Sequence, residues 1–153
     1  MVRKLSPEGF YHIRDPKNFH PAMRADVGLL LSKRAYLSLT TVIMCCLDAL
    51  AADSGKATRR KFESFVGKHF PELCTALESA CPGRKGGGIL YDEFRNGFAH
   101  LRSPKSKFAI AEDHELSGDW ADRVEVNAVG QFVAINIDRL AREFLRLLDQ
   151  LEV

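Results

Sequence analysis

The stretch NIDRLAREFLRLLDQL, residues 136–151, indicates the fold class more clearly than any other part of this chain. Its apolar residues recur at intervals of three and four, the spacing of one face of an α-helix. They occupy positions i, i+3, i+4, i+7, i+10, i+11 and i+14, namely Ile137, Leu140, Ala141, Phe144, Leu147, Leu148 and Leu151. We therefore predict a C-terminal helix over residues 136–151 that packs its apolar face against other helices.

Most of the remaining helical periodicity lies before residue 102. We predict a long helix from about Ala22 to Ala52, whose second half is apolar nearly all round and so belongs at the centre of a bundle. Further helices are predicted over residues 57–69, from Pro71 onward, and over residues 89–101, since proline is tolerated in a first helical turn. Residues 1–21 contain three prolines and lack helical periodicity, which predicts an irregular N-terminal arm.

After residue 103 the apolar spacing shortens from 3.6 toward 2, which is typical of β-strands. Short β-type runs are centred on Phe108, Val124 and Val133. We predict a single, mainly α domain over residues 1–153. It comprises the arm (1–21), a helical bundle (22–102), a small β-hairpin or short sheet inserted at 103–135, and the C-terminal helix (136–151).

Composition narrows the classes of function. The chain has 153 residues and a formal charge of +2, which is too small for nucleic-acid binding by bulk electrostatics, so any anion site must be a local patch. Its four cysteines lack the spacing of a zinc site and are interpreted as reduced core thiols of a cytoplasmic protein. We expect no metal, no cofactor and no membrane span, and the charged, proline-containing N-terminus predicts no export signal.

The glycine-rich stretch CPGRKGGG, residues 81–88, suggests a phosphate-binding loop at first sight. A P-loop requires Lys and then Ser or Thr directly after the last glycine, but Gly88 is followed by Ile89 and Leu90. We therefore predict a flexible connector, in which Arg84 and Lys85 remain available to contact an anion.

The stretch YDEFRNGFAHLR, residues 91–102, combines an apolar stripe with an unusual set of polar residues. Leu90, Phe94, Phe98 and Leu101 form the stripe, which would anchor the helix in the core and hold its polar residues rigidly. On an ideal helix, Asn96 and His100 share one flank of this stripe. Arg95 lies on the opposite flank, together with Tyr91 and Arg102.

A helix that carries Arg95, Asn96 and His100 in this order resembles the motif helix of the HEPN family, whose pattern is Arg, a polar residue, a spacer and His. The resemblance implies a helical bundle over residues 22–102 with the last helix, to which the β insert is an addition. It also implies metal-independent cleavage of RNA, usually by a homodimer, in stress response or defence, and in some branches a cognate regulatory protein. In one toxin branch a tyrosine follows the histidine by two positions, and Arg102 stands there instead.

The resemblance assigns a role to each motif residue. His100 would act as general base or acid, because an imidazole with an unperturbed pKa of about 6.5 exchanges protons near neutrality. Arg95 would hold the phosphate and stabilise the charge of the transition state, and Asn96 would orient the imidazole or the phosphate. Because Arg95 and His100 point about 140° apart on a straight helix, we expect a two-fold dimer to supply them from different chains.

Several alternatives stay open at the level of sequence. The chain could be a non-catalytic HEPN-like module that binds nucleotide, RNA or a protein, or a structural helical protein without a site. Arg102, Lys105 and Lys107 form either a solvated basic turn or a phosphate track that continues from the motif. Tyr91 either stacks on a base or packs beside the stripe, and Trp120 either anchors its polar loop or contacts a partner.

Overall fold

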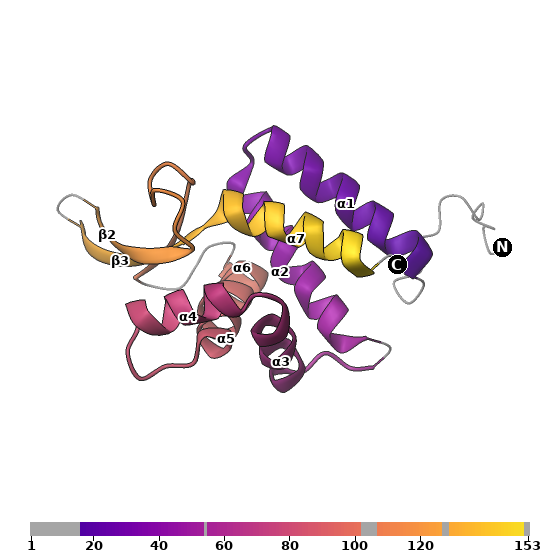
Figure 1. Ribbon diagram of the computed structural model, residues 1–153, viewed down its shortest axis with the longest axis horizontal. Helices are drawn as coiled ribbons and strands as arrows, with labels where there is room; N and C mark the ends of the chain where they lie inside the picture. The colour runs from indigo at the N-terminus through magenta and orange to yellow at the C-terminus, as the bar shows by residue number, and fades with distance from the viewer. Residues whose placement is uncertain (1–15, 54, 102–106, 127–128, 152–153) are drawn as a thin grey trace.

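The computed structural model describes residues 16–53, 55–101, 107–126 and 129–151, with the side chains of 16–18 and 99–101 outside the description. It confirms a mainly helical fold with a small sheet before the C-terminal helix (Figure 1). Helices α1 (Pro16–Ser32), α2 (Tyr36–Ala52) and α7 (Ile137–Leu151) pack together. Helices α3 (Arg59–His69) and α4 (Pro71–Ala80) lead to a helical rod of three segments, α5 (Gly86–Ile89), η2 (Leu90–Arg95) and α6 (Asn96–Leu101).

The predicted helix 22–52 is wrong in two respects, because helix formation begins at Pro16 and is interrupted at residues 33–35. Residues 16–21 of the predicted arm therefore belong to α1, whose sixth residue is Pro21. Arg34 adopts a left-handed conformation with φ of 53°, its amide donates to the Leu31 carbonyl, and the Ala35 amide donates to the Leu30 carbonyl. These bonds form a Schellman motif, which ends a helix.

Arg34 occupies the position where glycine is usual in this motif, so no residue type at this position indicates the break. Two side-chain contacts hold the arginine there, one local and one distant in sequence. Its Nε donates to the Tyr36 hydroxyl, and its guanidinium forms an ion pair with Glu112 at 2.7 Å. The turn reverses the chain, so α1 and α2 form a helical hairpin instead of one rod.

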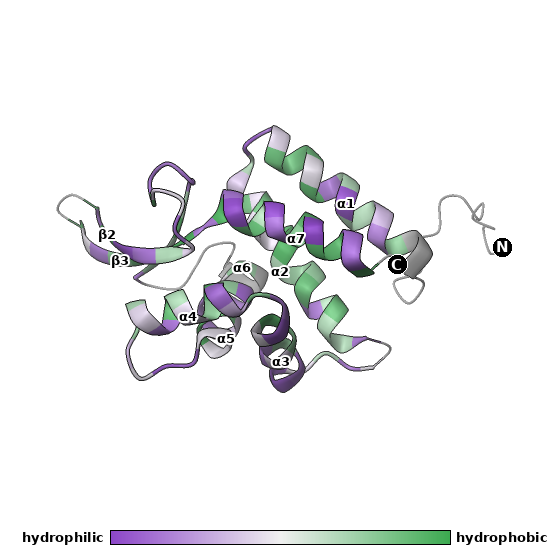
Figure 2. Cartoon of the chain, viewed as in Figure 1, coloured by the Kyte–Doolittle hydropathy of each residue, from purple (hydrophilic) through white to green (hydrophobic). Residues whose placement is uncertain are grey.

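The C-terminal helix is confirmed and lies at the centre of the fold. In Figure 2, green and purple bands alternate along α7, as expected for a helix with one apolar face. Six residues of that face are buried: Ile137, Leu140, Ala141, Phe144, Leu147 and Leu148. They pack into one core with α1, α2 and the rod of α5, η2 and α6, which we call the motif helix. In this core Ile43, Leu47, Phe94 and Phe98 are buried as predicted, and Val42 is only partly buried. No helix in the described part of the chain is long and apolar enough to cross a membrane.

The inserted sheet has three strands in the order β1-β3-β2. Strand β1 (Phe108–Ala111) pairs in parallel with β3 (Gly130–Asn136), and β2 (Ala121–Val126) pairs with β3 in an antiparallel hairpin. The side chain of Asn136 is fully buried and accepts from the Arg139 amide, which caps α7. The same side chain donates to Asp113 and to the Asp119 carbonyl, so it ties the loop between β1 and β2 to the start of α7.

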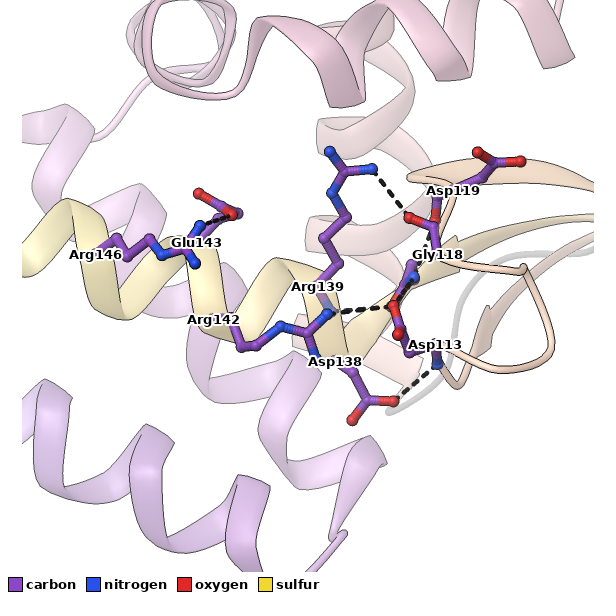
Figure 3. Close-up of polar contacts among 9 residues, drawn as sticks. Asp113, Gly118, Asp119, Asp138, Arg139, Arg142, Glu143 and Arg146 are labelled. Carbon is purple, nitrogen blue, oxygen red and sulfur yellow. Dashed lines mark hydrogen bonds and ion pairs between the residues drawn. The ribbon is translucent and has the colours of Figure 1, made fainter.

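Further contacts fix this loop against the helices (Figure 3). Arg142 forms an ion pair with Asp113, and Arg139 donates to the Gly118 carbonyl. Trp120 is buried, donates from Nε1 to Glu72 on α4, and carries the Arg139 guanidinium 4.4 Å above its ring. The structure thus decides between the two roles considered for Trp120, because the ring anchors its loop onto α4 and α7.

The predicted glycine-rich connector is correct only for residues 81–85, because Gly86–Gly88 are helical and buried. A Cβ atom at Gly86 would lie 2.3 Å from the carbonyl oxygen of Cys74, so only glycine allows α5 to approach α4 this closely. At Gly87 a Cβ atom would lie 3.2 Å from the backbone of Glu63 on α3. The glycines therefore seat the start of the motif helix against α3 and α4.

A pair of glycine substitutions tests this packing. Gly86→Ala is expected to lower the free energy of unfolding by about 1–3 kcal/mol or more, because the added methyl group overlaps the α4 backbone. Gly67→Ala is the matched control, since Gly67 is an exposed residue of α3 with nothing within 4 Å of its would-be Cβ. There we expect stabilisation by up to about 1 kcal/mol. Urea titration measures both, and equal effects at the two positions would contradict the close-packing role.

Candidate functional site around Arg95

Arg95 lies where the motif helix changes from π-helical to α-helical hydrogen bonding. Short π-helical segments within α-helices occur frequently at functional sites. Phe94 and Phe98, on either side of Arg95 in sequence, are fully buried, so the helix is anchored by its apolar stripe as predicted. The irregular turn lies before Arg95, and the backbone that follows, from Asn96 to Leu101, is α-helical.

The Arg95 guanidinium is held by two side chains. One nitrogen donates to Asp48 Oδ2 on α2 at 2.6 Å, and the other donates to Asn96 Oδ1 at 2.8 Å. The Arg95 side chain is 24% exposed and that of Asp48 is 14% exposed, so the ion pair is largely shielded from solvent. Burial by itself lowers the pKa of Arg95, but the hydrogen bond and charge of Asp48 raise it, and the net shift is upward. The guanidinium therefore stays charged while retaining N–H donors that neither partner uses.

Asp48 is the site residue that the sequence analysis missed. A signal for it exists, since it is the one acidic residue in the apolar helix α2. A carboxylate in such a helix needs a charged partner when it is shielded from water. The sequence does not say which of the chain's arginines supplies that partner, because Asp48 and Arg95 are 47 residues apart.

Tyr91 connects Arg95 with helix α3. Its ring packs edge-on against Phe62 with centroids 5.4 Å apart, which is the packing role considered for this residue. The guanidinium groups of Arg95 and Arg59 lie 5.2 Å and 5.8 Å from the same ring. Arg59 is held in turn by Glu63 and Asp92. On the face around Arg95, both Arg95 and Arg59 are thus already paired with carboxylates.

The structure describes only some of the other predicted site residues. The side chain of His100, and Arg102 and Lys105 altogether, lie outside the described residues. Arg84 forms an ion pair with Glu93 at 2.9 Å, and it borders a hollow of about 300 Å³ together with Lys85. Lys107 borders a different hollow, of about 290 Å³, between α4 and the sheet. Of the predicted phosphate track of Arg102, Lys105 and Lys107, only Lys107 lies within the described residues.

The cysteines differ from the predicted set of four core thiols. Cys46 and Cys74 are buried and Cys81 is half-buried, but Cys45 is exposed. Burial raises the pKa of Cys46 to about 12 and that of Cys74 to about 11. For Cys45, burial and Asp48 raise the pKa while the Arg95 cation lowers it, with a net upward shift. Within the described residues no cluster of His, Cys, Asp and Glu side chains is arranged to hold a metal ion.

A double-mutant cycle on Asp48→Ala and Arg95→Ala measures how strongly this ion pair holds the motif helix. We expect a coupling free energy of roughly 1–3 kcal/mol, between the values for exposed and for buried pairs. The control is the exposed Glu143–Arg146 pair on α7, for which less than about 0.5 kcal/mol is expected. A coupling at Asp48 and Arg95 no larger than the control would show that the contact does not fix Arg95.

Thiol reactivity gives a second test. With a thiol-specific reagent near pH 8, Cys45 should react first, and Cys46 and Cys74 should react only after unfolding, because burial both blocks access and disfavours the thiolate. The rate at Cys45 should rise with pH, since its raised pKa leaves it mostly protonated at pH 8. Mass spectrometry of digested protein locates the label, and unfolding in urea should make all four thiols react. Native Cys46 reacting as fast as Cys45 would contradict the assigned burial.

Comparison with known proteins leaves the site to be judged from its own residues. Searches of protein-family models, of curated proteins and of solved structures each give no match to this chain. The features that bear on the chemistry of the Arg95 face are its motif, its ion pair and its packing.

Proposed function

We propose that this protein is a metal-independent endoribonuclease of the HEPN type, acting in the cytoplasm in stress response or defence. The observation that carries the proposal is the fixed position of Arg95, a charged and partly exposed arginine on a well-anchored helix, in direct contact with the Asn96 of the same motif. A catalytic arginine needs this kind of support from its neighbours. Asp48 supplies it from α2 as a positioning residue.

The proposed reaction needs a base, an acid and a phosphate-binding cation. His100 removes the proton from an RNA 2'-hydroxyl, and the resulting oxygen attacks the adjacent phosphorus. The bond to the 5'-oxygen breaks, that oxygen takes up a proton from water, and His100 releases its proton to solvent. The products are a 2',3'-cyclic phosphate and a 5'-hydroxyl. Arg95 stabilises the charge that develops on the phosphate oxygens, for which its unused N–H donors are suited.

We propose further that the active form is a homodimer. On an ideal α-helix, residues at positions 95 and 100 point to different flanks, which is the reason for expecting two chains to share the site. A two-fold axis beside the motif helices would place Arg95 of one chain near His100 of the other. A cognate regulatory protein that covers this face is a further element of the proposal.

One observation favours a second function, that of a non-catalytic module binding RNA or nucleotide. Asp48 neutralises much of the Arg95 charge, and a paired arginine binds a phosphate less strongly than a free one. In such a module Arg95 would chiefly stabilise the packing of the motif helix on α2, and RNA would be bound without being cut.

Cleavage of mixed single-stranded RNA in EDTA tests the proposal. We expect fragments that end in 2',3'-cyclic phosphate, and a loss of rate of at least about 100-fold in both Arg95→Ala and His100→Ala, because each removes a group that acts in the transition state. Arg146→Ala, which removes an exposed arginine of α7, should retain the parental rate. Binding without cleavage would favour the module.

Mixing the two inactive variants extends the same experiment to the dimer. Under conditions that exchange subunits, restored cleavage is expected, because a mixed dimer contains one site with both Arg95 and His100 intact. An active protein that remains monomeric in solution would rule out the shared site.

A further inference from the structure

A second surface, separate from the Arg95 ion pair, carries more cationic than acidic side chains among the described residues. It is a groove of about 1000 Å³ between the end of α2, the exposed side of α3 and the end of α7. We call it the basic groove. Its principal polar lining residues are Thr58, Arg60, Lys61, Ser64, Lys68 and His69. Figure 2 shows purple, the colour of hydrophilic residues, over much of α3.

The charge of the basic groove is unusual for this chain. Among the described residues, every arginine except Arg60 and Arg123 forms an ion pair with a carboxylate. Neither Arg60 nor Lys68 forms an ion pair in the described part of the molecule, and Lys61 donates only to the Ala52 carbonyl at 3.4 Å. Asp53 is the acidic residue of the lining. The groove therefore holds an excess of positive charge, which favours an anionic ligand.

The spacing along α3 suits an extended ligand. Arg60, Ser64 and Lys68 follow one another at intervals of four, so they form a row about 12 Å long on one side of the helix. A row of this length offers cations at both ends and a hydroxyl between them. Successive backbone phosphates of a single strand present charge in this repeated way, whereas one small anion would use only one end.

An aromatic pair lies beside this row. The rings of Phe65 and His69 have centroids 4.5 Å apart, and both border the groove. Burial and the neighbouring Lys68 cation lower the pKa of His69, so near neutral pH its ring is uncharged. Uncharged aromatic surface next to cations is the combination by which proteins bind single-stranded nucleic acid without sequence preference.

The basic groove shares helix α2 with the carboxylate that holds Arg95. Ala51 and Ala52 border it at the end of α2, and Asp48, the partner of Arg95, lies one helical turn earlier on the same helix. We propose that the basic groove binds the backbone of single-stranded RNA and so holds the substrate beside Arg95. This inference rests on the proposed function for the identity of the ligand.

Binding of an uncleavable RNA tests the groove independently of catalysis. The probe is a fluorescein-labelled 2'-O-methyl oligouridine, which lacks the attacking hydroxyl, and the readout is fluorescence anisotropy over a series of salt concentrations. For Arg60→Ala/Lys68→Ala we expect affinity to fall about tenfold or more, and the slope of log K against log salt to fall by about 1.4, because two phosphate contacts are lost.

The matched control is Lys33→Ala/Arg146→Ala, which removes the same charge from exposed positions outside the groove. It should bind like the parent protein, and circular dichroism should show that both variants fold. Equal binding by the groove variant and the control would overturn the inference, even if the parent cleaves RNA. Groove-dependent binding of the probe by a parent that cleaves no RNA would support the inference while removing the proposed catalysis.

Vesicles of phosphatidylserine provide the remaining comparison. Binding to these vesicles that depends on Arg60 and Lys68, without binding to the RNA probe, would assign the basic groove to an anionic membrane surface and overturn the inference. We expect the probe to bind in a groove-dependent way and the vesicles to show no such dependence.

Discussion

The packing of α7 onto α1 and α2 is the interaction on which the rest of the structure depends. Six residues of its apolar face are buried, and the larger ones each contribute about 1.5–3 kcal/mol relative to exposure. The helix follows β3 without a linker, and Asn136 caps it while tying down the loop before β2. The packing of α7 thus positions the sheet and also completes the helical bundle. The sheet and α7 are far from α1 in sequence.

The motif helix is positioned by a second constraint, the close approach of α5 to α4 and α3. Glycines at 86–88 make this approach feasible, since a side chain at Gly86 would overlap the backbone of Cys74. Beyond the glycines, Phe94 and Phe98 bury the inner side of the rod, and Asp48 binds Arg95 at its edge. Arg95 is therefore fixed by backbone packing, by the hydrophobic core and by an ion pair together.

Charge is distributed unevenly between the face around Arg95 and the basic groove. Around Arg95 the cations are compensated by Asp48, Glu63 and Asp92, so that face contributes shape and oriented donors more than net charge. The basic groove along α3 has the reverse character, with cations that lack carboxylate partners among the described residues. Under the proposed function these faces have complementary tasks, because long-range attraction gathers a polyanion and short-range hydrogen bonds position the bond that is cut.

The sequence by itself determined the helical class, the C-terminal helix, the inserted strands and most of the core, because periodic spacing of apolar residues fixes which face of an element is buried. It also singled out Arg95 and Asn96 and placed them on an anchored helix. The break at Arg34, the burial of the glycine run and the Asp48 partner were decided only by tertiary structure. Each of these depends on residues distant along the chain: Glu112 pairs with Arg34, Cys74 leaves room only for glycine at position 86, and α2 brings Asp48 to Arg95. Local spacing carries no information about such encounters, because they exist only once the helices have packed.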